Sequence, residues 1–125
     1  MSKRFYITTA IDYVNGEPHI GHAYEKIITD VIARAHMSLG EEVFYLTGLD
    51  EHGQKVETSA HASGKSAQEY CDGLAETWRE FAERMNLANA DFVRTTSAAH
   101  KKVVQAVLAK LQENDHFYRE KYTGS

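Results

Sequence analysis

The sequence predicts an α/β fold in which flanking helices cover a doubly wound parallel sheet. Two observations support this prediction. Aromatic and β-branched runs of strand length alternate with longer stretches of helical periodicity, which is the pattern of βαβ units. Residues 43–47 also form a mostly apolar run between Gly40 and Gly48, as expected for a strand buried on both faces of a parallel sheet. Because parallel crossovers are nearly always right-handed, the loops after the strands are expected at one edge of the sheet, where ligands bind.

The first strand is predicted at residues 5–9, which are rich in aromatic and β-branched side chains. A polar, turn-forming loop follows at residues 12–18. Helical periodicity then begins, and Gly40 ends the helix. The apolar side chains that recur every four residues in this helix are Ala23, Ile27, Val31, Ala35 and Leu39.

A short helix at residues 54–63, ended by Gly64, follows the second strand. Ser66 and Glu69 then form the Ser-x-x-Glu pattern of a capping box ahead of a third helix. Its apolar stripe is expected to pack into the core, and Cys71 is expected to be a quiet, partly buried thiol on the same helix. The stripe consists of Tyr70, Leu74, Trp78, Phe81 and Met85.

A third strand is predicted at residues 91–96, and one more amphipathic helix follows and ends near Asn114. Residues 117–122 are expected to start an extended segment. The apolar residues of the last helix are Val104, Val107, Leu108 and Leu111.

The composition of the chain argues against several classes of protein. The chain of 125 residues is 42% hydrophobic, enough for one globular domain, and its net charge of −4 provides no basic surface for gripping a phosphate backbone. The single cysteine cannot form an internal disulfide or a Cys-x-x-Cys zinc site. No apolar run reaches the length of a signal peptide core or a membrane span, so a cytoplasmic location without a membrane partner is expected.

The strongest chemical signal is Pro-His-Ile-Gly-His at residues 18–22, where the first loop turns into the first helix. A helix amino terminus offers free N–H groups and a partial positive charge, which favour a phosphate. His19 and His22 lie on one face of the first turn, so both rings can donate to the same triphosphate. Gly21, without a side chain, lets a flat base approach the backbone.

Each of these residues also has a simpler explanation. The two histidines could form half of a metal site, or could be surface or core residues, and Gly21 could serve helix packing. No third ligand stands beside the pair in the sequence, so no metal site is expected.

Residues 7–22 resemble the His-Ile-Gly-His signature segment of class I aminoacyl-tRNA synthetases, specifically the methionyl enzymes. Residues 44–53, Phe-Tyr-Leu-Thr-Gly-Leu-Asp-Glu-His-Gly, look like the segment after that family's second strand. The resemblance continues through residues 92–96 and 117–124. It implies a partial Rossmann-like (HUP-type) fold, with residues 1–116 as the first half of the catalytic domain. Residues 117–125 would be the start of the connective-peptide insertion, where the chain is truncated.

The resemblance implies a methionine-tRNA ligase. Its substrates would be methionine, ATP with Mg²⁺ and tRNA(Met), and methionyl-adenylate would be the intermediate. His19 and His22 would be the catalytic residues that stabilise the phosphates and the transition state, and Gly21 would support the adenine. Asn15 and Glu25 align with further polar positions of the ATP site, although surface solvation explains them nearly as well.

For methionine, the resemblance points to the two loops at the sheet edge. The backbone of Ile11 and the carboxylate of Asp50 would hold the amino group, and Tyr13 would close over the thioether. An ammonium group needs a carboxylate partner, and an aromatic wall suits a flexible thioether. The simpler alternative is that residues 50–52 form an acidic, helix-capping turn.

Departures and missing parts limit what the resemblance implies. Asp12 and Leu49 stand where many relatives carry Tyr and Thr, and Arg94 aligns with a polar neighbour of the active site. The Lys-Met-Ser-Lys-Ser loop, the second half of the nucleotide fold, the zinc-bearing insertion and the anticodon-binding helices do not occur in the chain. We therefore expect the isolated chain to have no appreciable methionine activation, and its exposed half-sheet to favour self-association.

Two other functions remain open at this stage. One is a non-catalytic, stand-alone module derived from the synthetase that binds ATP, methionine or a protein. The other is a small nucleotidyltransferase that shares the His-x-Gly-His phosphate site, which the acidic segment around Asp50 and the following helices fit poorly.

Overall fold

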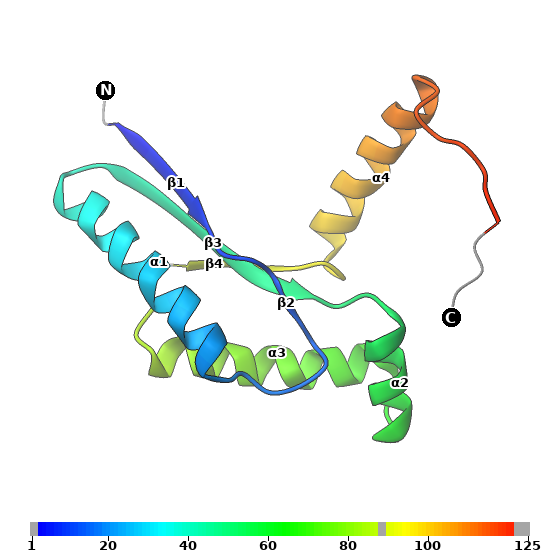
Figure 1. Cartoon of the computed structure of the whole chain (residues 1–125), viewed down its shortest axis with the longest axis horizontal. Helices are drawn as coiled ribbons and strands as arrows, with labels where there is room; N and C mark the ends of the chain where they lie inside the picture. The colour runs from blue at the N-terminus through cyan, green and yellow to red at the C-terminus, as the bar shows by residue number, and fades with distance from the viewer. Residues whose placement is uncertain (1–2, 88–89, 122–125) are drawn as a thin grey trace. The chain divides into compact units, whose positions relative to one another are not determined.

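The computed structural model describes residues 3–87 and 90–121. The chain divides into two units, residues 1–95 and residues 96–125, and each is described by itself. The elements of the first unit are β1 (Arg4–Thr8), β2 (Asp12–Tyr13), α1 (Ile20–Ser38), β3 (Glu42–Asp50), α2 (Gln54–Ala62), α3 (Ala67–Arg84) and β4 (Ala90–Arg94) (Figure 1). The predicted α/β class, with a parallel sheet and flanking helices, is confirmed.

All pairs of strands in the sheet are parallel, and β3 lies at its centre. Strands β1 and β4 both pair with Tyr45 and Leu46 of β3, so they occupy opposite edges of that strand. Strand β2 pairs with Leu49 and Asp50, on the same edge as β1, because β4 already pairs with Leu49 on the other. The carboxyl ends of the strands therefore converge, as the right-handed crossover predicts.

The short strand β2 was not predicted, because residues 12–18 read as a polar loop. After β1 the chain returns to the edge of β3 for two residues, and the Val14 N–H donates to the Asp50 carbonyl at 3.3 Å. This pairing buries the polar residue Asp12. Tertiary pairing overrides the local turn preference here.

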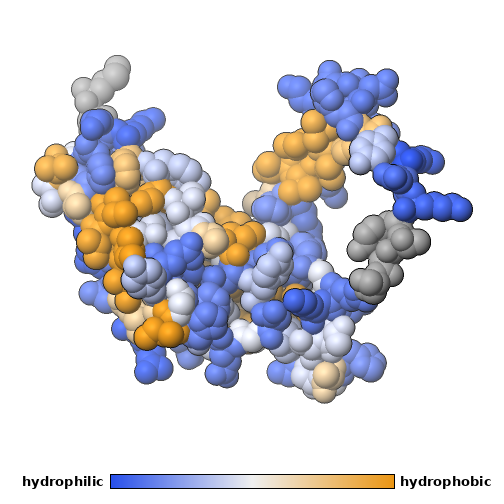
Figure 2. All heavy atoms as spheres, in the orientation of Figure 1, coloured by the Kyte–Doolittle hydropathy of each residue, from blue (hydrophilic) through white to orange (hydrophobic). Residues whose placement is uncertain are grey.

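Helix α1 was located correctly, and Gly40 adopts the positive φ of +79° that a glycine after a helix supplies. The four-residue apolar repeat does not mark the buried face, however. Val31 is 60% exposed and Ile27 is 42% exposed. Apolar side chains gather instead along the outer side of the helix, which Figure 2 shows in orange. The buried residues of the helix are Ala23, Lys26, Thr29, Asp30 and Ala33.

Strand β3 is longer than predicted, and only its second half is buried on both faces. Tyr45 and residues 47–49 are buried, whereas Phe44 is 47% exposed and its ring stacks on that of Tyr6. This part of the sheet therefore exposes apolar side chains, and self-association through them stays a prediction.

The core lies between the second half of the sheet and helices α2 and α3. The capping box at the start of α3 is present: the Ser66 hydroxyl accepts from the Glu69 N–H, and the Glu69 carboxylate accepts from the Ser66 N–H. The predicted stripe of α3 packs into the core except at its end, where Met85 is 38% exposed. The core residues are Val14, Leu49, Val56, Cys71, Ala75 and Trp78, with Tyr70, Leu74, Phe81 and Phe92 packed against them.

The second unit contains helix α4 (Ala98–Glu113), which confirms the predicted helix. The Ser97 hydroxyl caps it by accepting from the His100 N–H at 3.2 Å. Residues 116–121 form no regular element, so the expected extended segment makes no strand in the part that the structure describes. Its end at Tyr122, with residues 123–125, lies outside the described residues, and the boundary at residue 116 stays a prediction.

Candidate active site at the carboxyl edge of the sheet

The carboxyl edge of the sheet carries a hollow of about 310 Å³. It lies where β2 and the loop after it face the first turn of α1. The residues that line it include most of the predicted site residues. They are Ile11, Asp12, Tyr13, Asn15, Gly16, Glu17, His19 and His22.

A second hollow, of about 330 Å³, lies beside the start of α2 and shares Tyr13 and Asn15 with the first. Asp50 lines neither hollow, but it is the register partner of Tyr13 across β2 and β3. The structure thus brings the predicted methionine-binding residues next to the histidines, with Asp50 one strand away. Gly21 and Glu25 line neither hollow.

The two histidines form the amino-terminal cap of α1. His19 is the N-cap residue, and its Nδ1 accepts from the Gly21 N–H at 3.1 Å. The His22 Nδ1 accepts in turn from the His19 N–H at 3.1 Å. An imidazole whose Nδ1 accepts a hydrogen bond carries its proton on Nε2. Both rings are therefore held as Nε2–H donors, 3.8 Å apart between centroids, at a helix end that favours anions.

Gly21 has a structural reason of its own. A Cβ atom at this position would lie 3.0 Å from Cε1 and 3.1 Å from Nδ1 of the His19 ring. The absence of a side chain therefore gives the capping imidazole its place. The proposed support of an adenine base stays a prediction.

His22 is only partly exposed, and its surroundings were not foreseen. Its Nε2 lies 3.6 Å from the Asp12 carboxylate, and its ring meets Trp78 edge to face at 4.8 Å. Burial, the largest effect, lowers the pKa of His22. His19 and Lys26 lower it further, while Asp12 and Glu25 act in the opposite direction. The lowered pKa favours the neutral ring, which the acceptor role of Nδ1 requires.

Beneath His22 lies an ion pair between Lys26 and Asp12. Lys26 is 2% exposed and Asp12 is 7% exposed, and the ammonium group lies 5.3 Å from the centroid of the Trp78 ring. Sequence reasoning missed this pair, because Asp12 read as a loop residue and no motif singled out Lys26. A signal did exist: Lys26 is four residues from His22, on the same side of the helix.

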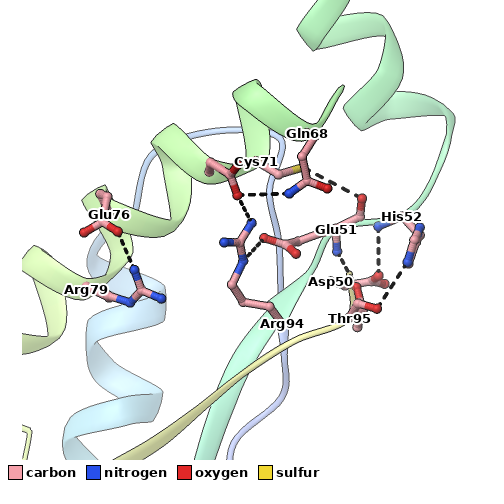
Figure 3. A network of polar contacts seen from close by, with 10 residues as sticks. Asp50, Glu51, His52, Gln68, Cys71, Glu76, Arg79, Arg94 and Thr95 are labelled. Atoms are coloured by element: carbon pink, nitrogen blue, oxygen red, sulfur yellow. Dashed lines mark hydrogen bonds and ion pairs between the residues drawn. The ribbon is translucent and has the colours of Figure 1, made fainter. Parts of the chain in front are cut away.

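The acidic segment after β3 is fixed by long-range contacts (Figure 3). The Glu51 N–H donates to the Thr95 hydroxyl at 2.9 Å, and the Glu51 carboxylate accepts from Arg94 Nε at 2.7 Å. Arg94 also donates to Asp72 of α3. The Arg94 pKa is raised, because these two carboxylates outweigh the opposite effect of burial. Arg94 thus holds the acidic segment against α3.

Asp50 and His52 close this segment. The Asp50 carboxylate accepts from the His52 N–H at 3.3 Å, and a ring nitrogen of His52 lies 3.3 Å from the Thr95 carbonyl. The residue before helix α2 is Gly53, which makes no side-chain cap. The alternative of a helix-capping acidic turn is therefore wrong for Asp50, whose carboxylate bonds only within its own turn among the contacts shown.

Glu25 and Cys71 take structural positions, whereas Asn15 belongs to the candidate site. Glu25 accepts from the Ala10 N–H at 3.1 Å and so holds the loop after β1. Asn15 lines both hollows. Cys71 is buried, which raises the pKa of its thiol, in agreement with the quiet thiol expected.

The described residues show no cluster of three or more histidine, cysteine, aspartate or glutamate side chains suited to a metal ion. Among the same residues, no helix is both long enough and apolar enough to span a bilayer.

The parallel sheet, with two histidines at the start of its first helix, is the arrangement that the resemblance to class I tRNA synthetases predicts. Solved structures agree. Methionyl-tRNA synthetase of Mycobacterium tuberculosis in complex with methionyl-adenylate superimposes with a TM-score of 0.86 at 38% identity, over 89% of this chain and 22% of that one. A leucyl enzyme of Agrobacterium radiobacter, at 22% identity and a TM-score of 0.83, shares the fold over 95% of this chain and 16% of its own.

Residues 5–125 match the family described as tRNA synthetases class I (M), and the chain belongs to this family. It is 50% identical over 121 residues to the methionine–tRNA ligase of Thermotoga maritima, and 47% identical over 120 residues to that of Rhizobium meliloti. These matches cover 97% and 96% of this chain but only 19% and 23% of the relatives. The predicted resemblance and the Rossmann-like fold are confirmed, and the chain spans about a fifth of the length of these curated relatives.

Proposed function

We propose that this chain forms the part of a methionine–tRNA ligase that binds ATP and methionine for the formation of methionyl-adenylate. The arrangement of His19 and His22 carries the proposal. Both rings are fixed as Nε2–H donors at a helix amino terminus, and both line the same hollow as Ile11 and Tyr13. Transfer of the methionyl group to tRNA(Met) and a cytoplasmic location, in keeping with the free thiol of Cys71, belong to the same proposal.

The histidines would contact the triphosphate of ATP, bound as its Mg²⁺ complex. Both rings line the hollow beside the amino terminus of α1, where the helix end favours an anion. Asn15 lines the same hollow, while Glu25 would act through the loop that it holds. Gly21 would keep the backbone open beside the adenine.

The methionine would lie between Tyr13 and the acidic segment. Asp50, across the strand pair from Tyr13, offers a carboxylate to the ammonium group, and the Ile11 carbonyl offers a second acceptor. The Tyr13 ring, which is 64% exposed, is free to close over the thioether.

The reaction needs donors more than it needs a base. An oxygen of the methionine carboxylate attacks the α-phosphorus of ATP, and the bond from that phosphorus to the bridging oxygen of pyrophosphate breaks. The carboxylate is already an anion, so no proton has to be removed. Negative charge builds up on the phosphate oxygens, and fixed imidazole N–H groups stabilise it.

Calorimetric titration of the 125-residue chain with MgATP and with methionine tests the proposal. His19→Asn is the sharpest variant, because asparagine can still cap the helix but lacks the Nε2 donor. We expect MgATP binding to weaken by about tenfold, the effect of one charge-assisted hydrogen bond, while methionine binding is unchanged. Tyr13→Ala should give the reverse pattern.

Equal MgATP affinity for the wild-type chain and His19→Asn would contradict the role of His19, and absence of both bindings would contradict the proposed site. Pyrophosphate exchange provides a separate test. We expect no appreciable methionine activation by the isolated chain, and turnover comparable with that of a full-length ligase would refute this.

A further inference from the structure

The hollow beside the two histidines contains a negatively charged side chain. Asp12 lines it together with His19 and His22. A carboxylate facing a triphosphate site would repel the ligand and would favour protonation of a neighbouring imidazole. Another group must therefore offset the negative charge of Asp12 if the hollow is to bind a triphosphate.

Lys26 is this group. Its ammonium group pairs with Oδ2 of Asp12, and the other oxygen, Oδ1, faces His22 Nε2 at 3.6 Å. Both members of the ion pair are more than nine-tenths buried. At this depth opposite charges are weakly screened, so the positive charge of Lys26 largely cancels the negative charge of Asp12 as seen from the hollow.

The same pair holds the ring of His22. The imidazole lies between the Asp12 carboxylate on one side and the edge-to-face contact with Trp78 on the other, and its Nδ1 bonds to the backbone of His19. Lys26 in turn packs near the face of Trp78. One side chain from β2, one from α1 and one from α3 thus fix the orientation of His22.

We propose that Asp12 and Lys26 are positioning residues for His22, and that Lys26 cancels a carboxylate charge that would otherwise repel a bound triphosphate. The part concerning the triphosphate rests on the proposed function. The part concerning His22 does not, because the pair and the ring are in contact without any ligand.

Titration of His22 by NMR in the ligand-free chain tests the first part. His22→Gln identifies the ring signal, since glutamine at this position can keep the capping contact. Lys26→Met should raise the pKa of His22, because the charge of Asp12 is then no longer offset. Asp12→Asn should lower it, because Lys26, His19 and burial remain while only Glu25 opposes them. The double variant Asp12→Asn/Lys26→Met should return it toward the wild-type value.

Binding of inorganic tripolyphosphate and of MgATP tests the second part. Lys26→Met should weaken both by about tenfold, the effect expected of one partly screened charge a few ångströms away. The double variant should recover the wild-type affinity to within about threefold, because it removes both charges. Lys65→Met, at an exposed lysine between α2 and α3, is the matched control for the loss of one positive charge and should leave the affinity unchanged.

Opposite shifts of the His22 pKa in the two single variants support the proposal. Shifts of the same sign, or no shifts, overturn the proposal. A pair that serves stability alone would not shift the His22 pKa in opposite directions in the two variants. If Lys26→Met does not fold, Asp12→Asn compared with the double variant decides the sign. If the wild-type chain binds neither polyphosphate, the proposed function and the charge-cancelling part fail together, while the titration still decides the positioning of His22.

Discussion

The two segments beside the candidate site are held by contacts of different range. Residues 19–22, the histidine turn, are fixed mainly by contacts among themselves. The rings of His19 and His22 accept hydrogen bonds from backbone groups two and three residues away. The acidic segment is fixed by Thr95 and Arg94, which are 43 or more residues away, and by α3. A local cap forms wherever its helix forms, whereas the acidic segment takes its shape only when β3, β4 and α3 have assembled.

Arg94→Met should have the largest effect and should separate the two segments. It removes the arginine partner of the buried Glu51 carboxylate, and breaking a buried pair costs about 3 kcal/mol of unfolding free energy. Denaturant unfolding measures the loss, and NMR should show the ring signal of His52 moving while those of His19 and His22 stay in place. Arg4→Met, in an exposed pair with Glu42, is the control and should change little. Equal movement of all three rings would show that the segments are coupled.

Gly48→Ala should disturb the base of the acidic segment next. A Cβ atom at Gly48 would lie 2.2 Å from the Val93 carbonyl oxygen of the adjacent strand, so β3 and β4 must move apart. Overpacking of this kind costs about 2 kcal/mol. The control is Gly73→Ala, in α3, where an added Cβ meets nothing within 4 Å and should be neutral or slightly stabilising. Equal stability of the two variants would mean that β3 and β4 can move apart at no cost in unfolding free energy.

The smallest expected effect is that of His19→Ala on the histidine turn. The variant removes the N-cap acceptor, which costs about 1 kcal/mol, and His19→Asn should restore most of it. Thermal unfolding followed by circular dichroism measures both. An alanine variant as stable as the wild-type chain would show that packing, rather than the cap, places the turn.

The same difference in range explains which parts of the fold could be predicted. Helices α1, α2, α3 and α4 follow local periodicity and caps, and each ends close to the residue predicted for its end. Strand β2 was missed, because its pairing with β3 is visible only when the two segments meet. The buried side of α1 was not apparent either, since Lys26 and Asp30 turn inward while Val31 remains exposed.

The sequence by itself determined the βαβ order, the place of the two histidines at a helix amino terminus, and the family, because these depend on residues close together in the chain or on a contiguous signature. Only the tertiary structure decided what surrounds His22 and what anchors Asp50. Burial makes an ion pair between Asp12 and Lys26 matter, and strand assembly brings Arg94 to Glu51. The spacing of residues along the chain predicts neither the burial nor the strand assembly. Both depend on which distant segments pack together and exclude water.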